Sequence, residues 1–125
     1  MKTLLALVIS VLSITTSYSQ SYDFDVVKLK TGLYNPYLEN YNTDVPDKYV
    51  QGMRVYYMNG VILMSDEAHS NYRVIKMLDQ SDGCVTYTGT DEKDRDIIII
   101  LCATEPMGTL TIIYPKKYYI SYYIK

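Results

Sequence analysis

The stretch Val55–Met64 reads VYYMNGVILM, which is two runs of β-favouring residues around the pair Asn59-Gly60. Asn-Gly adopts positive φ readily at both central positions of a type I′ turn, and the twist of that turn matches the flanking strands. The stretch therefore predicts a two-residue β-hairpin.

Toward the C-terminus, five further runs predict strands: Tyr72–Leu78, Cys84–Thr90, Ile97–Cys102, Leu110–Tyr114 and Tyr118–Ile124. Turn or loop clusters separate them, namely Gln80–Gly83, the charged Asp91–Asp96, Glu105–Gly108 and Pro115–Lys117. Ile97–Cys102 is apolar at every position, which predicts a central strand covered on both faces.

Toward the N-terminus, Phe24–Lys30 predicts an opening strand, and the long connection Thr31–Asp47 follows it. Within the 31–47 connection, Asn35 is a candidate N-cap with Pro36 at the first position of a short helix. That helix would place three side chains on one side: Tyr37, Leu38 and Tyr41. In total the chain predicts an all-β fold, an antiparallel meander of about eight strands. Eight such strands form either a small barrel or a two-sheet sandwich.

The N-terminal segment has the three parts of a secretory signal. Lys2 supplies a positive start, Leu4–Ile14 is uncharged and apolar, and Ser17 and Ser19 place small residues at the peptidase positions. We therefore expect a signal peptide over residues 1–19, cleaved between Ser19 and Gln20, and a single β domain over 20–125. The mature protein would be secreted, periplasmic or extracellular, without an integral membrane segment.

The charges of the predicted mature chain argue against one class of partner. Removing residues 1–19 from the 125 leaves 106 residues, with 11 Lys and Arg against 14 Asp and Glu, because Lys2 is the only charge lost. The charges are scattered and form no basic run, which argues against nucleic acid as a partner. We expect no cofactor.

Cys84 and Cys102 are the two cysteines of the chain. In an exported protein such a pair predicts a disulfide. If the Asp91–Asp96 loop is symmetric about Lys93, residues facing each other across it have numbers that sum to 186, as these two do. The sequence therefore predicts a bond that joins adjacent antiparallel strands.

Candidate chemistry is sparse, so we expect no enzyme and no metal site. His69 is the single histidine, and the least favoured functional alternative is a small hydrolase that uses it with Asp66 or Glu67. The acidic side chains of Asp91–Asp96 alternate with Lys93 and Arg95, which favours a solvated hairpin tip over a calcium loop.

Tyrosine is the outstanding feature of the composition, with 15 tyrosines, one Phe and no Trp. On the last strand Tyr119 and Tyr123 share one face, opposite Tyr118 and Tyr122. We take Tyr119 and Tyr123, with Tyr34, Tyr37 and Tyr41 of the connection, as a possible binding surface. The leading hypothesis is a non-enzymatic module that binds an unknown protein or extended surface, and the partner classes left open are protein, glycan and apolar ligand.

An exported eight-strand meander with an insertion after its first strand resembles the lipocalin and fatty-acid-binding architectures. The resemblance lies in topology alone. It implies a second hypothesis, a carrier that holds a small apolar ligand beneath the Thr31–Asp47 insertion.

Overall fold

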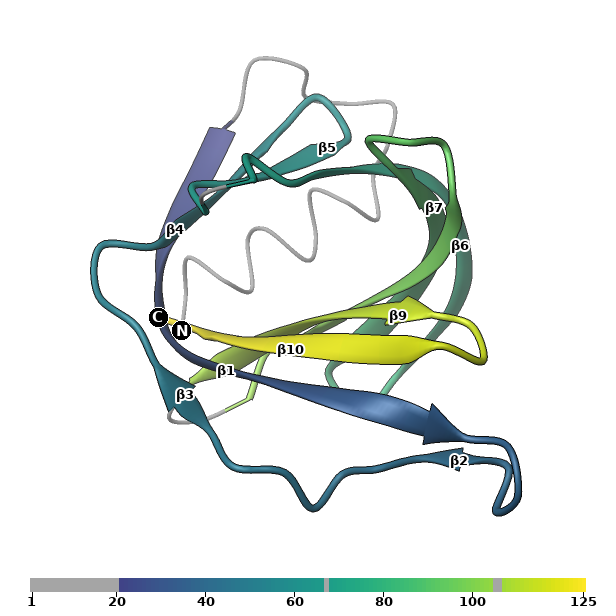
Figure 1. Ribbon diagram of the computed structural model, residues 1–125. Coiled ribbons are helices and arrows are strands. Elements are labelled where there is room, and N and C mark those ends of the chain that lie inside the picture. The colour runs from purple at the N-terminus through teal and green to yellow at the C-terminus, as the bar shows by residue number, and fades with distance from the viewer. Residues whose placement is uncertain (1–20, 67, 105–106) are drawn as a thin grey trace.

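The computed structural model describes residues 21–66, 68–104 and 107–125, which fold as an antiparallel β-barrel (Figure 1). These ranges contain no helix and ten strands: β1 (Ser21–Asn35), β2 (Asn40–Tyr41), β3 (Lys48–Tyr49), β4 (Arg54–Met58), β5 (Val61–Met64), β6 (Asn71–Ser81), β7 (Cys84–Asp91), β8 (Asp96–Cys102), β9 (Gly108–Tyr114) and β10 (Tyr118–Ile124). Over the same ranges, nothing helical has the length and apolarity needed to cross a membrane. The predicted signal peptide 1–19 and the turn residues Glu105 and Pro106 lie outside the described residues.

The barrel consists of β1 and β4–β10. It is a meander, because each of these strands pairs with the next barrel strand along the chain and β10 pairs with β1. Strand β1 is 15 residues long and pairs with two strands of the barrel, besides the short β2 and β3. Its first part, Ser21–Asp25, pairs with β4, and Val26–Leu33 pairs with β10. A register shift between Val26 and Lys28 marks the bulge where β1 passes from one neighbour to the other. The prediction of a small barrel is confirmed.

The Asn-Gly hairpin is formed as predicted. Met58 pairs with Val61 across the turn, and Asn59 and Gly60 have φ values of 55° and 77°. These are the two positive angles of a type I′ turn, so the local signal alone sets the register of β4 and β5.

Alternate residues of the barrel strands point into the lumen and form one core. The most deeply buried side chains are Tyr87, Ile97, Ile99, Leu101, Leu110, Ile112, Ile124 and Val85. The prediction that Ile97–Cys102 is covered on both faces is wrong for the outer face. Ile98 and Ile100 are only half-buried there, because no segment among the described residues forms a second layer over the outside of this strand.

The short helix expected in the 31–47 connection is also absent. The Asn35 side chain does accept hydrogen bonds from the Tyr37 and Leu38 N–H groups, at 2.9 and 3.2 Å, as an N-cap would. The turn then ends at Glu39, whose φ is 51°, and β2 returns to pair with β1. A helix of this length gains too little from its few hydrogen bonds, whereas the hairpin extends an existing strand.

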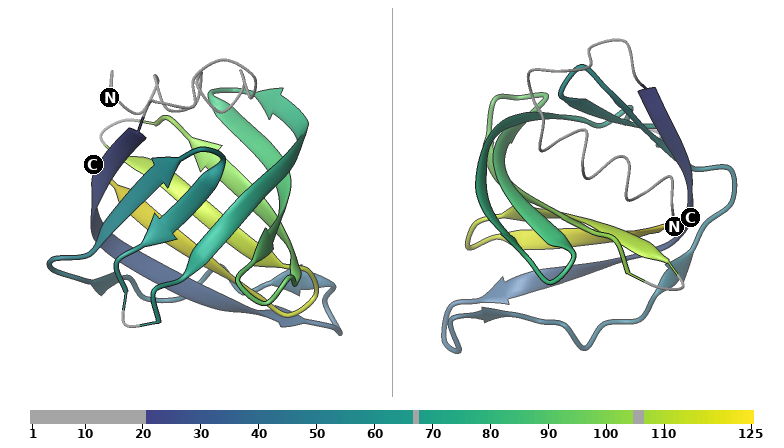
Figure 2. Two further views of the ribbon diagram at one scale, coloured as in Figure 1. Left: turned by 90° about the horizontal axis from the view of Figure 1, so that it is seen from above. Right: turned by 180° about the vertical axis from the view of Figure 1, so that it is seen from behind.

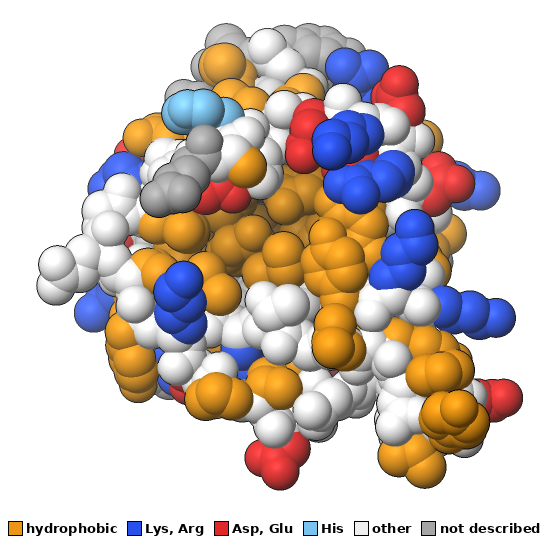
Figure 3. Space-filling view, viewed as in Figure 1, with side chains coloured by type: hydrophobic (Ala, Val, Ile, Leu, Met, Phe, Trp, Pro, Cys, Tyr) orange, Lys and Arg blue, Asp and Glu red, His pale blue; other side chains and the backbone are white. Residues whose placement is uncertain are grey.

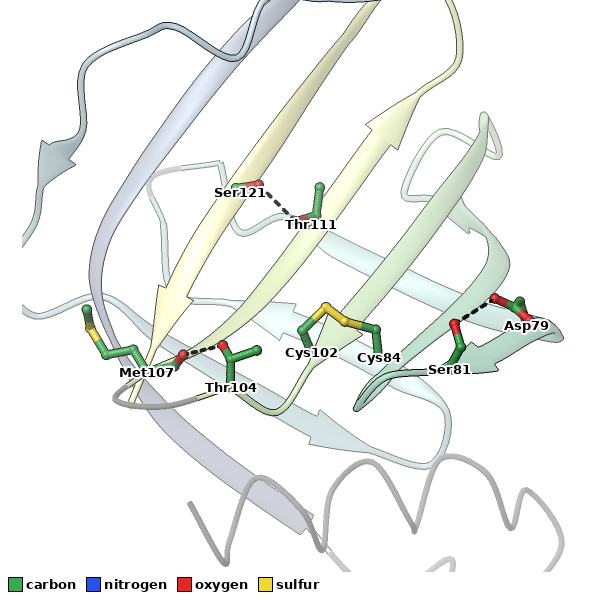
Figure 4. Close-up of a disulfide and its surroundings, with 8 residues drawn as sticks. All are labelled: Asp79, Ser81, Cys84, Cys102, Thr104, Met107, Thr111 and Ser121. Atoms are coloured by element: carbon green, nitrogen blue, oxygen red, sulfur yellow. Dashed lines mark hydrogen bonds between the residues drawn. A yellow bond between two sulfur atoms is a disulfide. The ribbon is translucent and has the colours of Figure 1, made fainter.

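The disulfide joins Cys84 of β7 to Cys102 of β8, with the Cα atoms 4.1 Å apart (Figure 4). The two residues are direct partners in the β7–β8 ladder, so the register predicted from the symmetric loop is confirmed. The bond lies on the outside of the barrel wall, since its neighbours Val85 and Leu101 point into the lumen.

Candidate binding groove

The outer surface of β7–β10 carries no charged side chain between its rims. The outward residues are Cys84, Thr86, Thr88 and Thr90 on β7, Ile98, Ile100 and Cys102 on β8, Thr109, Thr111 and Ile113 on β9, and Tyr119, Ser121 and Tyr123 on β10. Asp96 at the start of β8 marks one rim. We call this surface the uncharged wall. It is built from hydroxyls, isoleucines and tyrosines.

A segment of residues 40–49, here called the strap, crosses outside the barrel and covers part of this wall. Figures 1 and 2 show it running from β2 to β3 along the outside of β1. Backbone hydrogen bonds fix it at both ends, from Asn42 N–H to Leu33 O at 2.9 Å and from Val50 N–H to Val27 O at 3.1 Å. An ion pair of 2.9 Å between Lys28 and Asp47 lies between these points.

Gly32 permits the closest approach of the strap to the barrel. It is the cross-strand partner of Tyr119, and a Cβ atom at Gly32 would overlap both the Tyr119 ring and the carbonyl oxygen of Asn42. The Tyr119 ring lies over the glycine, is 6% exposed, and its hydroxyl donates to Asn42 O at 3.1 Å. The side chain thus anchors the strap to the wall.

Between the strap and strands β9 and β10 lies an open groove of about 390 Å³. Its lining residues are Lys30, Tyr41, Thr43, Thr109, Thr111, Ile113, Tyr119, Ser121 and Tyr123. The lining combines three aromatic rings with several hydroxyl groups, and only one of these residues is charged. A site of this composition suits a neutral ligand that has both apolar faces and hydrogen-bonding groups.

Hydrogen bonds and ring contacts hold the groove in shape. The hydroxyls of Thr111 and Ser121 are 2.8 Å apart across the β9–β10 pair (Figure 4). The Tyr41 ring packs edge-on against Tyr119, with centroids 6.0 Å apart, and its hydroxyl accepts from the Lys116 N–H at 2.9 Å. The ammonium of Lys28 lies 4.7 Å from the centroid of the Tyr123 ring. The groove is therefore preformed.

The structure brings four of the five sequence-selected tyrosines together. Tyr41, Tyr119 and Tyr123 line the groove, and Tyr34 packs behind Tyr41 with ring centroids 5.1 Å apart. Tyr37 stands apart at the β1–β2 turn, 94% exposed. Figure 3 shows apolar side chains projecting at the lower right, where Figure 1 places that turn.

Sequence reasoning missed the polar part of the groove. Thr109, Thr111 and Ser121 are short hydroxyl residues that any strand tolerates, so their type alone indicates no site. The sequence signal for their position was that they alternate with lumen-facing apolar residues such as Leu110 and Ile112. It assigns them to the outer face of the barrel, but it does not reveal that the strap faces them.

In the loop after β7, residues 92–96 are exposed as predicted, but the Asp91 side chain is fully buried. Its carboxylate accepts hydrogen bonds from the Lys93 and Arg95 N–H groups at 2.9 Å, from the Tyr114 hydroxyl at 2.9 Å, and from Arg95 Nε at 2.6 Å. Burial alone would raise the pKa of this carboxyl, but these hydrogen bonds lower it to about 2. Burial and the bond to Asp91 both raise the pKa of Tyr114.

The residues of the hydrolase alternative do not converge in the described part of the chain. His69 is exposed and has a φ of 50° in a loop turn, where its N–H donates to the carbonyl of Asp66. The Asp66 carboxylate accepts hydrogen bonds from the N–H and hydroxyl of Ser70. Glu67 lies outside the described residues.

Comparison of the chain with protein-family models, curated proteins and solved structures found no significant match.

Proposed function

We propose that the mature chain is an exported, non-enzymatic binding domain that docks a neutral partner surface against the uncharged wall. The absence of charge across four adjacent strands is the observation that carries this proposal. Well-solvated protein surfaces are about 25–35% charged, whereas the centres of binding interfaces are depleted of charge and enriched in tyrosine. The groove lies at the β9–β10 side of the wall and gives the partner a point of entry.

A test of this proposal places charge on the wall without disturbing the core. Thr88→Lys and Ile100→Lys each add a cation at a half-buried outward position of the uncharged wall. Tyr56→Lys and Leu63→Lys are the matched controls, because they form an outward pair on β4 and β5, 40% and 39% exposed. The measurement is the fraction of the exported protein retained on the envelope of the cells that produce it.

We expect the wild type and both controls to be retained and the two wall variants to be released into the medium. Thermal unfolding of each variant shows whether its fold is intact. Equal retention of all five folded proteins would contradict the proposal, because the position of the added charge would then have no effect.

A second candidate function is carriage of a small apolar ligand at the barrel end that faces the viewer in Figure 1. Figure 3 shows apolar side chains at the bottom of a hollow there. The enclosed cavity among Phe24, Val55, Tyr57 and their neighbours measures only about 10 Å³, which is room for one water molecule at most. A ligand would therefore sit in the hollow. Titration with dodecanoate, followed by tyrosine fluorescence, should saturate at one equivalent, and an unchanged signal would contradict carriage.

A further inference from the structure

We infer that the neutral partner is a polysaccharide and that the groove holds one of its sugar units. The inference rests on the proposed function, because it names the partner of the same wall. It goes further by assigning a ligand class to particular side chains: the hydroxyls of Thr111 and Ser121 and the ring of Tyr123.

Backbone pairing argues against an extended peptide as the occupant. Strand β9 is paired with β8 and β10, and β10 is paired with β9 and β1. No strand edge is open along the floor of the groove, so a peptide could not add to the sheet there through main-chain hydrogen bonds. The floor offers side chains only, and these are rings and hydroxyls.

The hydroxyl pair matches the hydrogen-bonding character of a sugar. Thr111 and Ser121 share one hydrogen bond 2.8 Å long, in which either atom is able to donate. Each hydroxyl has one donor and two acceptor positions, so the pair keeps one donor and further acceptors for a ligand. A sugar hydroxyl both donates and accepts, and it satisfies such a pair. A phosphate or carboxylate has only acceptors and would need more positive charge than Lys30 supplies.

The rings and the dimensions of the groove agree with this assignment. Tyr41 and Tyr123 are half-buried in the lining, and the C–H face of a pyranose packs against such rings. The volume of about 390 Å³ is near the lower end of the roughly 300–1,000 Å³ that ligand sites span. Because the groove is open, a chain of sugars is able to continue along the wall past Thr88 and Ile100.

The first experiment identifies the partner class on the envelope itself. Envelope from producing cells is treated either with periodate, which cleaves vicinal diols of sugars, or with protease, and the exported full-length product is then rebound. We expect periodate to abolish retention and protease to leave it unchanged. Loss after protease with full retention after periodate would overturn the saccharide assignment, while sensitivity to Thr88→Lys would still support the uncharged wall.

The second experiment locates the sugar unit in the groove. Native electrophoresis is run through gels that contain neutral polysaccharides: an α-glucan, a β-glucan, a mannan or a galactan. We expect at least one gel to retard the wild-type protein, and the double variant Thr111→Val/Ser121→Ala to bind about tenfold more weakly, since it loses about two ligand hydrogen bonds.

Tyr56→Phe is the matched control, because it removes an outward hydroxyl from β4, outside both the groove and the uncharged wall. It should be retarded as strongly as the wild type. Absence of retardation in every gel, or equal retardation of the double variant and the wild type, would overturn the inference.

Discussion

The two sides of the barrel have the same interior chemistry and opposite exteriors. On both sides, most lumen-facing positions are apolar and pack into one core. Outside, the uncharged wall of β7–β10 contrasts with the side formed by β4–β6 and the start of β1, here called the charged wall, whose outward residues include Asp23, Asp25, Arg54, Arg73 and Lys76. Packing of one core fixes the interior residues on both sides. The exterior is free to vary, so two sides that share one core are able to differ in surface charge.

The two walls should also differ in the interactions that stabilise them. Arg54 on the charged wall pairs with Asp23 and with Asp25, at 2.6 Å in the second case, and all three side chains are 38–67% exposed. Exposed pairs of this kind contribute little to stability. The uncharged wall instead depends on a buried carboxylate at its rim, a covalent bond and a close backbone approach. The stabilities of four variants, one of them also measured as a function of pH, test this difference.

The largest loss is expected from Asp91→Asn at the rim of the uncharged wall. The amide removes the charge that Arg95 and Tyr114 contact and leaves buried donors without an acceptor. We expect the free energy of unfolding to fall by about 3 to 5 kcal/mol in urea denaturation. Asp96→Asn in the same loop is the control and should change it by less than about 0.5 kcal/mol, because Asp96 is exposed. Similar losses in both variants would contradict the role assigned to Asp91.

The same variant gives a pH test. The folded pKa of Asp91, about 2, lies below the ordinary value of 3.8, so the unfolded chain binds the proton more readily. Its contribution to stability is therefore present above about pH 4 and is lost as the pH falls toward 2. The wild type should lose stability over this window more steeply than Asp91→Asn. Parallel curves would contradict the low pKa.

The second loss is expected from Cys84→Ala/Cys102→Ala, which removes the covalent link of the uncharged wall. The two residues are 18 positions apart, and chain-entropy arguments give about 3 kcal/mol for a loop of this size. Urea denaturation of the double variant, compared with the oxidised and reduced wild type, measures the loss in free energy of unfolding. The reduced wild type should be as stable as the double variant. If reductant does not change the stability of the wild type, the disulfide makes no such contribution.

The third-largest loss of stability is expected from Gly32→Ala, because the added methyl group forces the strap and Tyr119 apart. Overpacking of this kind lowers the free energy of unfolding by about 1 to 3 kcal/mol. A double-mutant cycle with Tyr119→Ala should show coupling, because removal of the ring opens one of the two contacts that the new methyl group meets. A cycle with Tyr56→Ala on the charged wall is the control and should be additive. Additivity in both cycles would contradict the contact.

The smallest loss is expected from Arg54→Met on the charged wall. It removes both ion pairs, yet the free energy of unfolding should fall by less than about 1 kcal/mol, because the partners remain solvated. Thermal or urea unfolding at low and high salt measures this loss. A loss as large as that from disulfide removal would show that the two walls do not differ as argued.

The sequence predicted features that local patterns determine. The Asn59-Gly60 turn and the β7–β8 register follow from residues close in the chain, and the barrel follows from a succession of tight turns. Alternation also assigned Tyr119 and Tyr123 to the outer face correctly. These predictions needed no knowledge of which distant segments meet.

The remaining features depend on distant contacts. Tyr41 and Asn42 reach the β9–β10 region over separations of 75 and 77 residues, through the space left by Gly32. No local pattern encodes that path, so the groove could not be predicted. Asp91 was misjudged for a similar reason, because its burial depends on Tyr114, a residue 23 positions away. The expected helix failed because an available strand edge competed with it.

Closure of the barrel by β1 and β10 has a consequence for the order of folding. The pair joins Val26 to Ile124, so it closes a loop that spans nearly the whole domain, whereas every other strand pairing joins consecutive strands or lies within the first half of the chain. Loop closure of this length is slow compared with the formation of hairpins. Until β10 pairs with both of them, β1 and β9 each present an unpaired edge. Because an unpaired strand edge can pair with another chain, a strand from a second copy is able to fill the gap if closure is delayed.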